Sequence, residues 1–207
     1  MGDGLDIFFD DTRDFDEFKI RLKSIFSNYT PRAVDKPEFR KSAVMMLLLN
    51  RDNQACVLLT KRTSTVSSHK GQMSFPGGGY DDEDLDLMQT ALRETREEVG
   101  IAPEDIEPAG RFDDFISIAG FHVACYIGFI PHPYEYSINR DEIDDYVEVP
   151  LSLFRDERYD RVETVEFEGN SYSVYYYSYN GFIIWGMTAR ILTDFARKVL
   201  KYGEREG

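Results

Sequence analysis

The spacing of apolar residues predicts a chain of mixed helices and strands. Residues 14–28 carry apolar side chains at helical spacing, which predicts an amphipathic helix; its apolar positions are Phe15, Phe18, Leu22, Ile25 and Phe26. Short apolar runs bounded by turn residues predict strands in the stretches 42–50, 55–61, 110–118, 122–130, 161–169, 171–179 and 182–186. The order of these elements therefore decides the fold class.

One predicted helix, at 84–99, stands between strands, and the other helices lie outside them in the sequence. This order predicts an α/β fold in which helices cover both sides of a sheet. Turn signals join neighbouring strands at 51–54, at Gly169-Asn170 and at Asn180-Gly181. An acidic stretch before Pro150 predicts a short helix or loop that leads into a further strand.

We expect one domain over residues 1–207, because 207 residues with 42% hydrophobic content can bury a single core. Within it, residues 1–40 are expected to form an N-terminal helical extension and residues 187–203 a C-terminal helix.

The stretch 75–101, FPGGGYDDEDLDLMQTALRETREEVGI, places a glycine-rich segment before the central helix. Pro76 and the three glycines after it predict a tight turn or bulge. Asp82 or Asp84 is expected to cap the start of the helix, and Gly100 suits the left-handed residue that ends it.

Three glutamates crowd the last turns of this helix. Glu94, Glu97 and Glu98 are spaced i, i+3 and i+4, so they share one face, and the helix dipole opposes anions at that end. Arg93 can pair with Glu97, yet the local charge stays negative. Two interpretations are open at this point: a solvated acidic face, or a site for a divalent cation, which prefers carboxylate and carbonyl oxygens.

The overall charge limits the classes of partner. A net charge of −14 argues against general binding to nucleic acid or to anionic membranes. The apolar runs are too short to span a bilayer, and the first residues do not resemble a signal peptide. Cys56 and Cys125 lie in apolar stretches and are expected to be core thiols, so we expect a cytoplasmic protein that is a monomer or a homodimer.

The stretch 77–101 closely resembles the Nudix box of hydrolases that cleave nucleoside diphosphates linked to another moiety. Its second half matches from Arg93 to Ile101 as RETREEVGI, whereas Leu85 stands where the box has a glutamate. The resemblance implies the Nudix fold, with a mixed sheet sandwiched between helices (α/β/α).

A narrower resemblance, to the coenzyme A pyrophosphatase branch of this family, covers about residues 42–195. It is carried by LLTKR, HKGQ and FPGG within 58–78, by an Asp-rich loop after them, by NRDE before VPL, and by WGMTARIL near the end. It implies hydrolysis of the pyrophosphate bond of coenzyme A or its thioesters, giving 3′,5′-ADP and 4′-phosphopantetheine or its acyl derivative.

The resemblance also implies roles for individual residues. Mg²⁺ or Mn²⁺ would bind Glu94, Glu97, Glu98 and the carbonyl of Gly77, with Arg93 holding the glutamates by ion pairing. Glu142 is the candidate for a further metal ligand or a general base, with Asp141 and Glu148 next. The candidates for contact with the substrate are Arg62, His69, Lys70 and Gln72.

Two alternatives remain at this stage. The same chemistry could act on another nucleoside diphosphate derivative, such as ADP-ribose or a dinucleotide. The chain could also be a catalytically silent Nudix-fold binding module, although such a module would have no need for clustered anions at a helix end.

Overall fold

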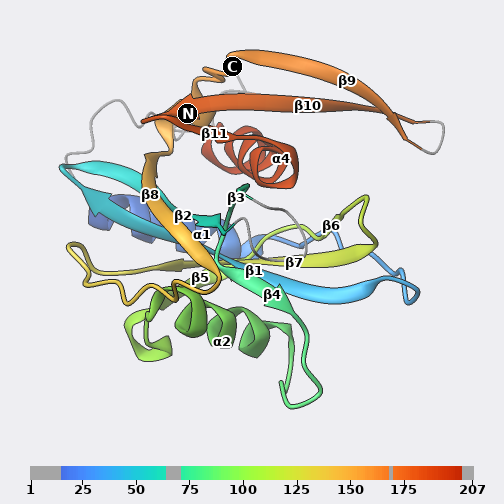
Figure 1. Ribbon diagram of the computed structural model, residues 1–207. Coiled ribbons are helices and arrows are strands. Elements are labelled where there is room, and N and C mark those ends of the chain that lie inside the picture. Colours follow the sequence, from blue (N-terminus) through green and yellow to red (C-terminus); the bar gives the residue numbers. More distant parts are fainter. Residues whose placement is uncertain (1–14, 64–70, 168–169, 202–207) are drawn as a thin grey trace.

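The computed structural model describes residues 15–63, 71–167 and 170–201. Figure 1 shows a central sheet with one helix below it, further helices above it and a small second sheet at the top. The helices are α1 (Phe15–Asn28), α2 (Leu87–Val99), α3 (Ser152–Arg155) and α4 (Gly186–Phe195), with a π-helical turn, η2 (Ala196–Leu200), after α4. The α/β fold with a sheet covered on both sides is confirmed.

The large sheet is mixed and has eight strands, in the order β3-β2-β1-β7-β5, with β4 and β6 beside β1 and β7 and with β8 beside β2. Its strands are β1 (Arg40–Arg51), β2 (Gln54–Arg62), β3 (Met73–Ser74), β4 (Gly77–Gly79), β5 (Glu107–Arg111), β6 (Phe115–Ile116), β7 (Phe121–Phe129) and β8 (Ile143–Pro150). Among the strand pairs of this sheet that the described residues form, only β1–β7 is parallel.

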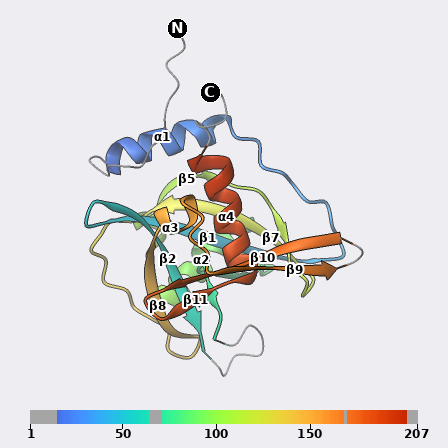
Figure 2. The same cartoon turned by 90° about the horizontal axis from the view of Figure 1, so that it is seen from above.

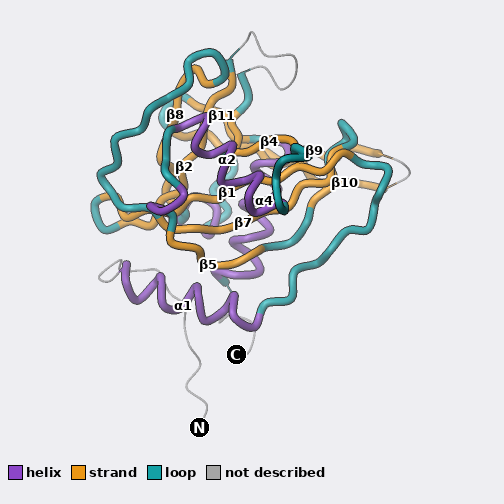
Figure 3. Tube along the Cα trace, turned by 90° about the horizontal axis from the view of Figure 1, so that it is seen from below, coloured by secondary structure: helices purple, strands orange, loops and turns teal. Residues whose placement is uncertain are grey.

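Strand β1 is apolar throughout its centre because both of its faces are buried. Met45 and Leu47 belong to the cluster under α2, whereas Met46 and Leu48 belong to the cluster that contains residues of α1 and α4. Figures 2 and 3 show α1 beside β5, on the side of the sheet away from α2. The strand thus separates two hydrophobic clusters, one that packs against α2 and one that contains residues of α1 and α4.

A second sheet of three strands covers α4 (Figure 1). Its strands are β9 (Arg161–Phe167), β10 (Asn170–Tyr179) and β11 (Phe182–Ile184). Tyr177 is fully buried, whereas Trp185 is 39% exposed and stacks on Tyr176 with ring centroids 5.8 Å apart. Trp185 is the last residue before α4 and links that helix to β11.

The strand predicted over 110–118 is interrupted after Arg111, because two consecutive aspartates turn inward. Asp113 and Asp114 are both buried and bind the segment that follows α1. Asp113 accepts hydrogen bonds from the Tyr29 hydroxyl (2.8 Å), the Arg32 backbone amide (2.9 Å) and Lys198. Asp114 accepts from the Val34 amide (3.2 Å) and Arg111 (2.6 Å), and it contacts His122 Nε2 (2.8 Å).

Two predictions about apolar segments are tested by the structure. Cys56 and Cys125 are buried and unpaired, as expected for core thiols. None of the helices in the described part of the chain is long and apolar enough to cross a membrane.

Candidate active site

Helix α2 begins three residues later than the sequence predicted. Asp86, and not Asp82 or Asp84, is the N-cap, and its side chain accepts a hydrogen bond from the Gln89 amide at 2.9 Å. Leu85 therefore lies outside the helix and is 90% exposed. The helix ends as predicted at Gly100, whose φ of 74° is the left-handed conformation.

The three glycines before α2 form a strand and not the tight turn or bulge that we expected. They run antiparallel to β1, with Gly77 opposite Val44 and Gly79 opposite Ser42. A Cβ on Gly77 would lie 2.3 Å from the Ala43 carbonyl oxygen, and a Cβ on Gly78 would lie 2.4 Å from the carboxyl carbon of Glu94. Glycine is required here because the strand passes directly between β1 and the glutamate face.

Arg93 ties the strand, the loop and two of the glutamates together. Its guanidinium donates to Glu94 at 2.9 Å, to Glu97 at 3.2 Å and to the Gly79 carbonyl at 3.1 Å. The other side of the guanidinium forms two 3.0 Å bonds with Asp84. The predicted pairing of Arg93 with the glutamates is therefore present in the structure.

Asp84 was expected only as a possible helix cap, and its pairing with Arg93 was missed by sequence reasoning. It is buried, accepts from the Thr90 hydroxyl at 2.7 Å, and its hydrogen bonds with Arg93 hold its pKa well below the usual range. It stands one residue before Leu85, the position at which the Nudix box has a glutamate. The signal was present in the Asp-rich loop, but spacing alone did not single out one aspartate.

Glu98 is the most deeply buried of the three glutamates, with a side chain 1% exposed. One carboxylate oxygen accepts from Arg62 at 3.0 Å, and the other accepts from the Gly77 amide at 3.2 Å. Burial raises the pKa of Glu98 to about 8 despite these two partners, and the charges of Glu94 and Glu142 add to the rise. A solvated acidic face is therefore the wrong interpretation for this residue.

Glu94 and Glu97 are more open than Glu98. The Glu94 side chain is 16% exposed, and burial, followed by the charges of Glu97 and Glu142, raises its pKa against the opposing effect of Arg93. Glu97 is 53% exposed. The face thus grades from a buried carboxylate to a solvent-accessible one.

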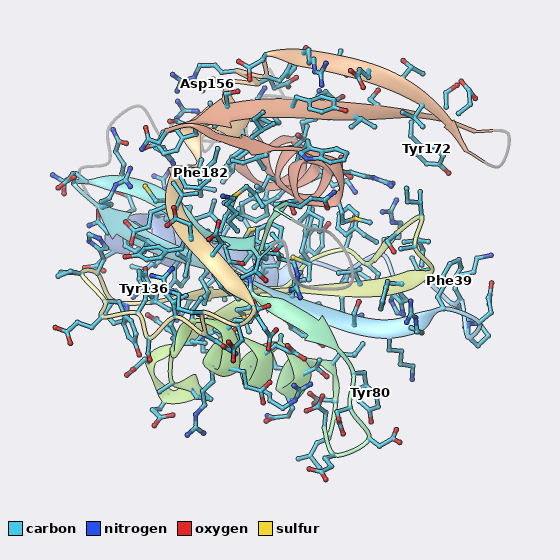
Figure 4. The ribbon with its side chains drawn as sticks, viewed as in Figure 1. Phe39, Tyr80, Tyr136, Asp156, Tyr172 and Phe182 are labelled. Atoms are coloured by element: carbon cyan, nitrogen blue, oxygen red, sulfur yellow. The ribbon has the colours of Figure 1, made fainter. Side chains whose placement is uncertain are left out.

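The loop between β7 and β8 brings Glu142 to this face. The amides of Ser137 and Asn139 donate to the carbonyls of Val99 and Glu98, at 2.9 and 3.0 Å, so the loop caps the end of α2. Figure 4 shows Tyr136 on the same loop and Tyr80 at the other end of α2. Glu142 is half-buried and accepts a 3.4 Å hydrogen bond from the Asn139 side chain.

The other candidates for the general base and for substrate contact differ in their surroundings. Glu148 is held by Tyr136 at 3.0 Å, by Arg51 and by His132, which leaves it structurally engaged, while Asp141 is exposed. The Gln72 carbonyl accepts from the Arg62 amide at 3.1 Å. The other two expected substrate contacts, His69 and Lys70, lie outside the described residues.

The charges of the glutamate face suit a divalent cation, but its carboxylates are not gathered around a single point. Within residues 15–63, 71–167 and 170–201, no three acidic, histidine or cysteine side chains form a preassembled metal cage. Arg62 and Arg93 instead occupy the carboxylate oxygens. Burial raises the pKa values of Glu94 and Glu98 against the opposing effect of these guanidinium groups, and a further cation beside the carboxylates would favour their ionised form.

A glutamate-rich helix that follows a glycine strand, on a mixed sheet covered on both sides, defines the class of Nudix-fold proteins. The family model described as "NUDIX domain" matches residues 39–166, and the chain belongs to this family.

Curated relatives agree with this assignment. The "Uncharacterized Nudix hydrolase NudL" of Cronobacter sakazakii is 37% identical over 167 residues, which are 80% of this chain and 84% of that protein. The protein of the same name from Klebsiella pneumoniae (strain 342) is 33% identical over 92% of this chain and 97% of its own length. A MutT/nudix family protein from Enterococcus faecalis shares the fold, with a TM-score of 0.50 and 19% identity over 88% of this chain and 73% of its own.

Proposed function

We propose that this protein hydrolyses the pyrophosphate bond of coenzyme A or its thioesters, with Mg²⁺ or Mn²⁺ as cofactor. The observation that carries a hydrolytic function is the buried, incompletely neutralised Glu98, which lies between the glycine strand and the loop that holds Glu142. Burial of an acid destabilises the fold, and a module that only binds nucleotides would gain nothing from it. The choice of coenzyme A rests on the LLTKR, HKGQ and FPGG stretches of residues 58–78.

The cation is proposed to bind Glu94, Glu97, Glu98 and the Gly77 carbonyl. When bound, it supplies positive charge that neutralises the pyrophosphate oxygens. Arg93 keeps two of the glutamates in place through its ion pairs, and Asp84 fixes the orientation of Arg93.

Glu142 is proposed as the general base. It would accept a proton from water as the water oxygen bonds to phosphorus and the bridging P–O bond breaks, which gives 3′,5′-ADP and 4′-phosphopantetheine. Arg62, His69, Lys70 and Gln72 are proposed to contact the substrate, because Arg and Lys offer charge to phosphate oxygens.

A substrate panel tests the proposal. The purified protein with Mg²⁺ is incubated with coenzyme A, 3′-dephospho-coenzyme A, ADP-ribose and a dinucleotide, and the products are separated by chromatography. Coenzyme A should exceed its dephospho form by about 10- to 150-fold in kcat/KM, the scale of one lost charge-assisted contact. A preference for ADP-ribose would place the protein elsewhere in the family, and binding of every compound without turnover would indicate a binding module.

A further inference from the structure

Arg62 and Glu98 form an ion pair in which only the arginine side chain has access to solvent. The Arg62 side chain is 23% exposed, whereas that of Glu98 is 1% exposed. The Arg62 backbone is fixed on both sides, because its amide donates to the Gln72 carbonyl at 3.1 Å and its carbonyl accepts from the Gly71 amide at 3.1 Å. Because the Arg62 side chain is partly exposed, the guanidinium can move away from Glu98 into solvent. The backbone hydrogen bonds keep the strand in place while it does so.

The guanidinium and a divalent cation compete for the same oxygen. Glu98 has two carboxylate oxygens, and the second is already engaged by the Gly77 amide at 3.2 Å. A cation bound to the first oxygen would take the place of Arg62 and would also repel it. Arg62 and the divalent cation therefore exclude each other from this oxygen of Glu98.

We propose that Arg62 is a resident counter-ion of the metal site, and that it is released to the substrate phosphates when a divalent cation binds Glu98. This inference rests on the proposed function and adds a role to it. Before the cation binds, Arg62 compensates the buried carboxylate. Afterwards its five N–H donors are free for phosphate oxygens, so metal binding prepares the phosphate site.

The effect of removing Arg62 on metal affinity distinguishes a competitor of the metal from a residue that supports the metal ligand. If Arg62 remained on Glu98 and oriented it for the metal, loss of Arg62 would weaken metal binding. As a competitor, Arg62 must weaken metal binding when it is present, so its loss strengthens metal binding.

The experiment measures Mn²⁺ affinity by calorimetry in the absence of substrate, for the wild type, Arg62→Ala and Lys61→Ala. Lys61→Ala is the matched control, because it removes the same charge one residue away, where Lys61 pairs with Asp144 at 2.8 Å on the surface. We expect Kd for Mn²⁺ to fall about tenfold or more in Arg62→Ala, the scale of a displaced charge-assisted bond, and to stay unchanged in Lys61→Ala. An unchanged or weaker affinity in Arg62→Ala overturns the proposal.

A second measurement is made on the wild type, so its result does not depend on how Arg62→Ala folds. In the wild type, the side-chain Nε–H resonance of Arg62, assigned by its loss in Arg62→Lys, should shift when Mg²⁺ is added. A resonance that does not respond to saturating Mg²⁺ contradicts release. Both readouts are independent of turnover, so a protein that shows them but hydrolyses no substrate in the panel would refute the proposed function alone.

Discussion

Two acidic clusters of this protein each contain a carboxylate that is almost completely buried, but they neutralise it differently. Asp113 receives a hydroxyl, a backbone amide and an ammonium group, and Asp114 receives an amide, a guanidinium and a histidine contact. Glu98 receives one guanidinium and one amide, and Glu94 lies beside it. The first cluster holds the segment after α1, and the second faces the glycine strand.

The titration behaviour follows this difference. Burial alone would raise the pKa of Asp113, but the Arg32 amide, Lys198 and Tyr29 outweigh burial and hold it below its usual value. Burial dominates at Glu98 and Glu94, whose pKa values are raised. A buried acid with a complete set of donors stabilises the fold, whereas an undercompensated one is suited to bind a further cation.

The largest expected effect on turnover is at Glu98. Glu98→Gln should lower kcat/KM by about 10³-fold, the upper end of the scale for losing an electrostatic group aimed at the transition state. Its melting temperature in EDTA at pH 8 should hold or rise, because a neutral amide replaces an acid that burial prevents from ionising freely. Glu104→Gln, at an exposed position, is the control, and full activity of Glu98→Gln would remove the distinction between the two clusters.

Glu142→Gln comes next. A general base contributes about 10²-fold or more, so kcat should fall by that order while calorimetry shows unchanged metal affinity. Weakened Mn²⁺ binding would make Glu142 a ligand instead. If neither quantity changes, Glu142 is only a loop residue near the glutamates.

Asp84→Asn should have a smaller effect, because Asp84 acts through Arg93. We expect kcat/KM to fall about 10- to 100-fold, as for the outer partners of other metal sites, with a smaller change in KM. Leu85→Glu restores the family pattern but should neither raise activity nor rescue Asp84→Asn, since Leu85 is 90% exposed whereas Asp84, which pairs with Arg93, is buried. Rescue by Leu85→Glu would contradict the role assigned to Asp84.

Asp113→Asn should leave kcat/KM per folded molecule unchanged. Loss of its charge-assisted bonds should instead lower the free energy of unfolding by about 1.5 to 3 kcal/mol, measured by denaturant titration. A loss of activity without a loss of stability would show that the first cluster also serves the chemistry.

The pH dependence of stability provides the most specific contrast between the two clusters. In EDTA the folded protein keeps a proton on Glu98 that the unfolded chain releases above about pH 4.5, so the contribution of Glu98 is complete below that pH and is lost as pH rises towards 8. Asp113 behaves in the opposite way, with a contribution present above the unfolded pKa and lost as pH falls. Melting curves of the wild type and Glu98→Gln from pH 5 to 8 should therefore diverge, whereas the deficit of Asp113→Asn should stay constant.

Local patterns were sufficient to predict most of the fold. The two-residue turn at Asn180-Gly181, the helix over 14–28 and the left-handed Gly100 all depend on neighbouring residues, and the structure contains each of them. The start of α2 was predicted wrongly, because several aspartates in a row could each serve as a cap. In the structure Asp84 pairs with Arg93 and Thr90, and Asp86 is the residue that caps the helix.

The site was less predictable than the fold. The spacing of Glu94, Glu97 and Glu98 indicated a shared face, but not that Glu98 is buried while Glu97 remains exposed. That difference arises because β4 and the loop before β8 close over one end of α2. Contacts between segments so far apart in the sequence leave no periodic signal in either of them.

Glu98 also links segments that are distant in the chain. Its carboxylate binds Gly77 and Arg62, and its carbonyl accepts the amide of Asn139. The last turn of α2 therefore cannot open without disturbing the glycine strand and the loop together. Amide hydrogen exchange at Asn139 would consequently report the local opening of the whole site, so a cation bound among the glutamates should slow exchange in a loop that it does not touch.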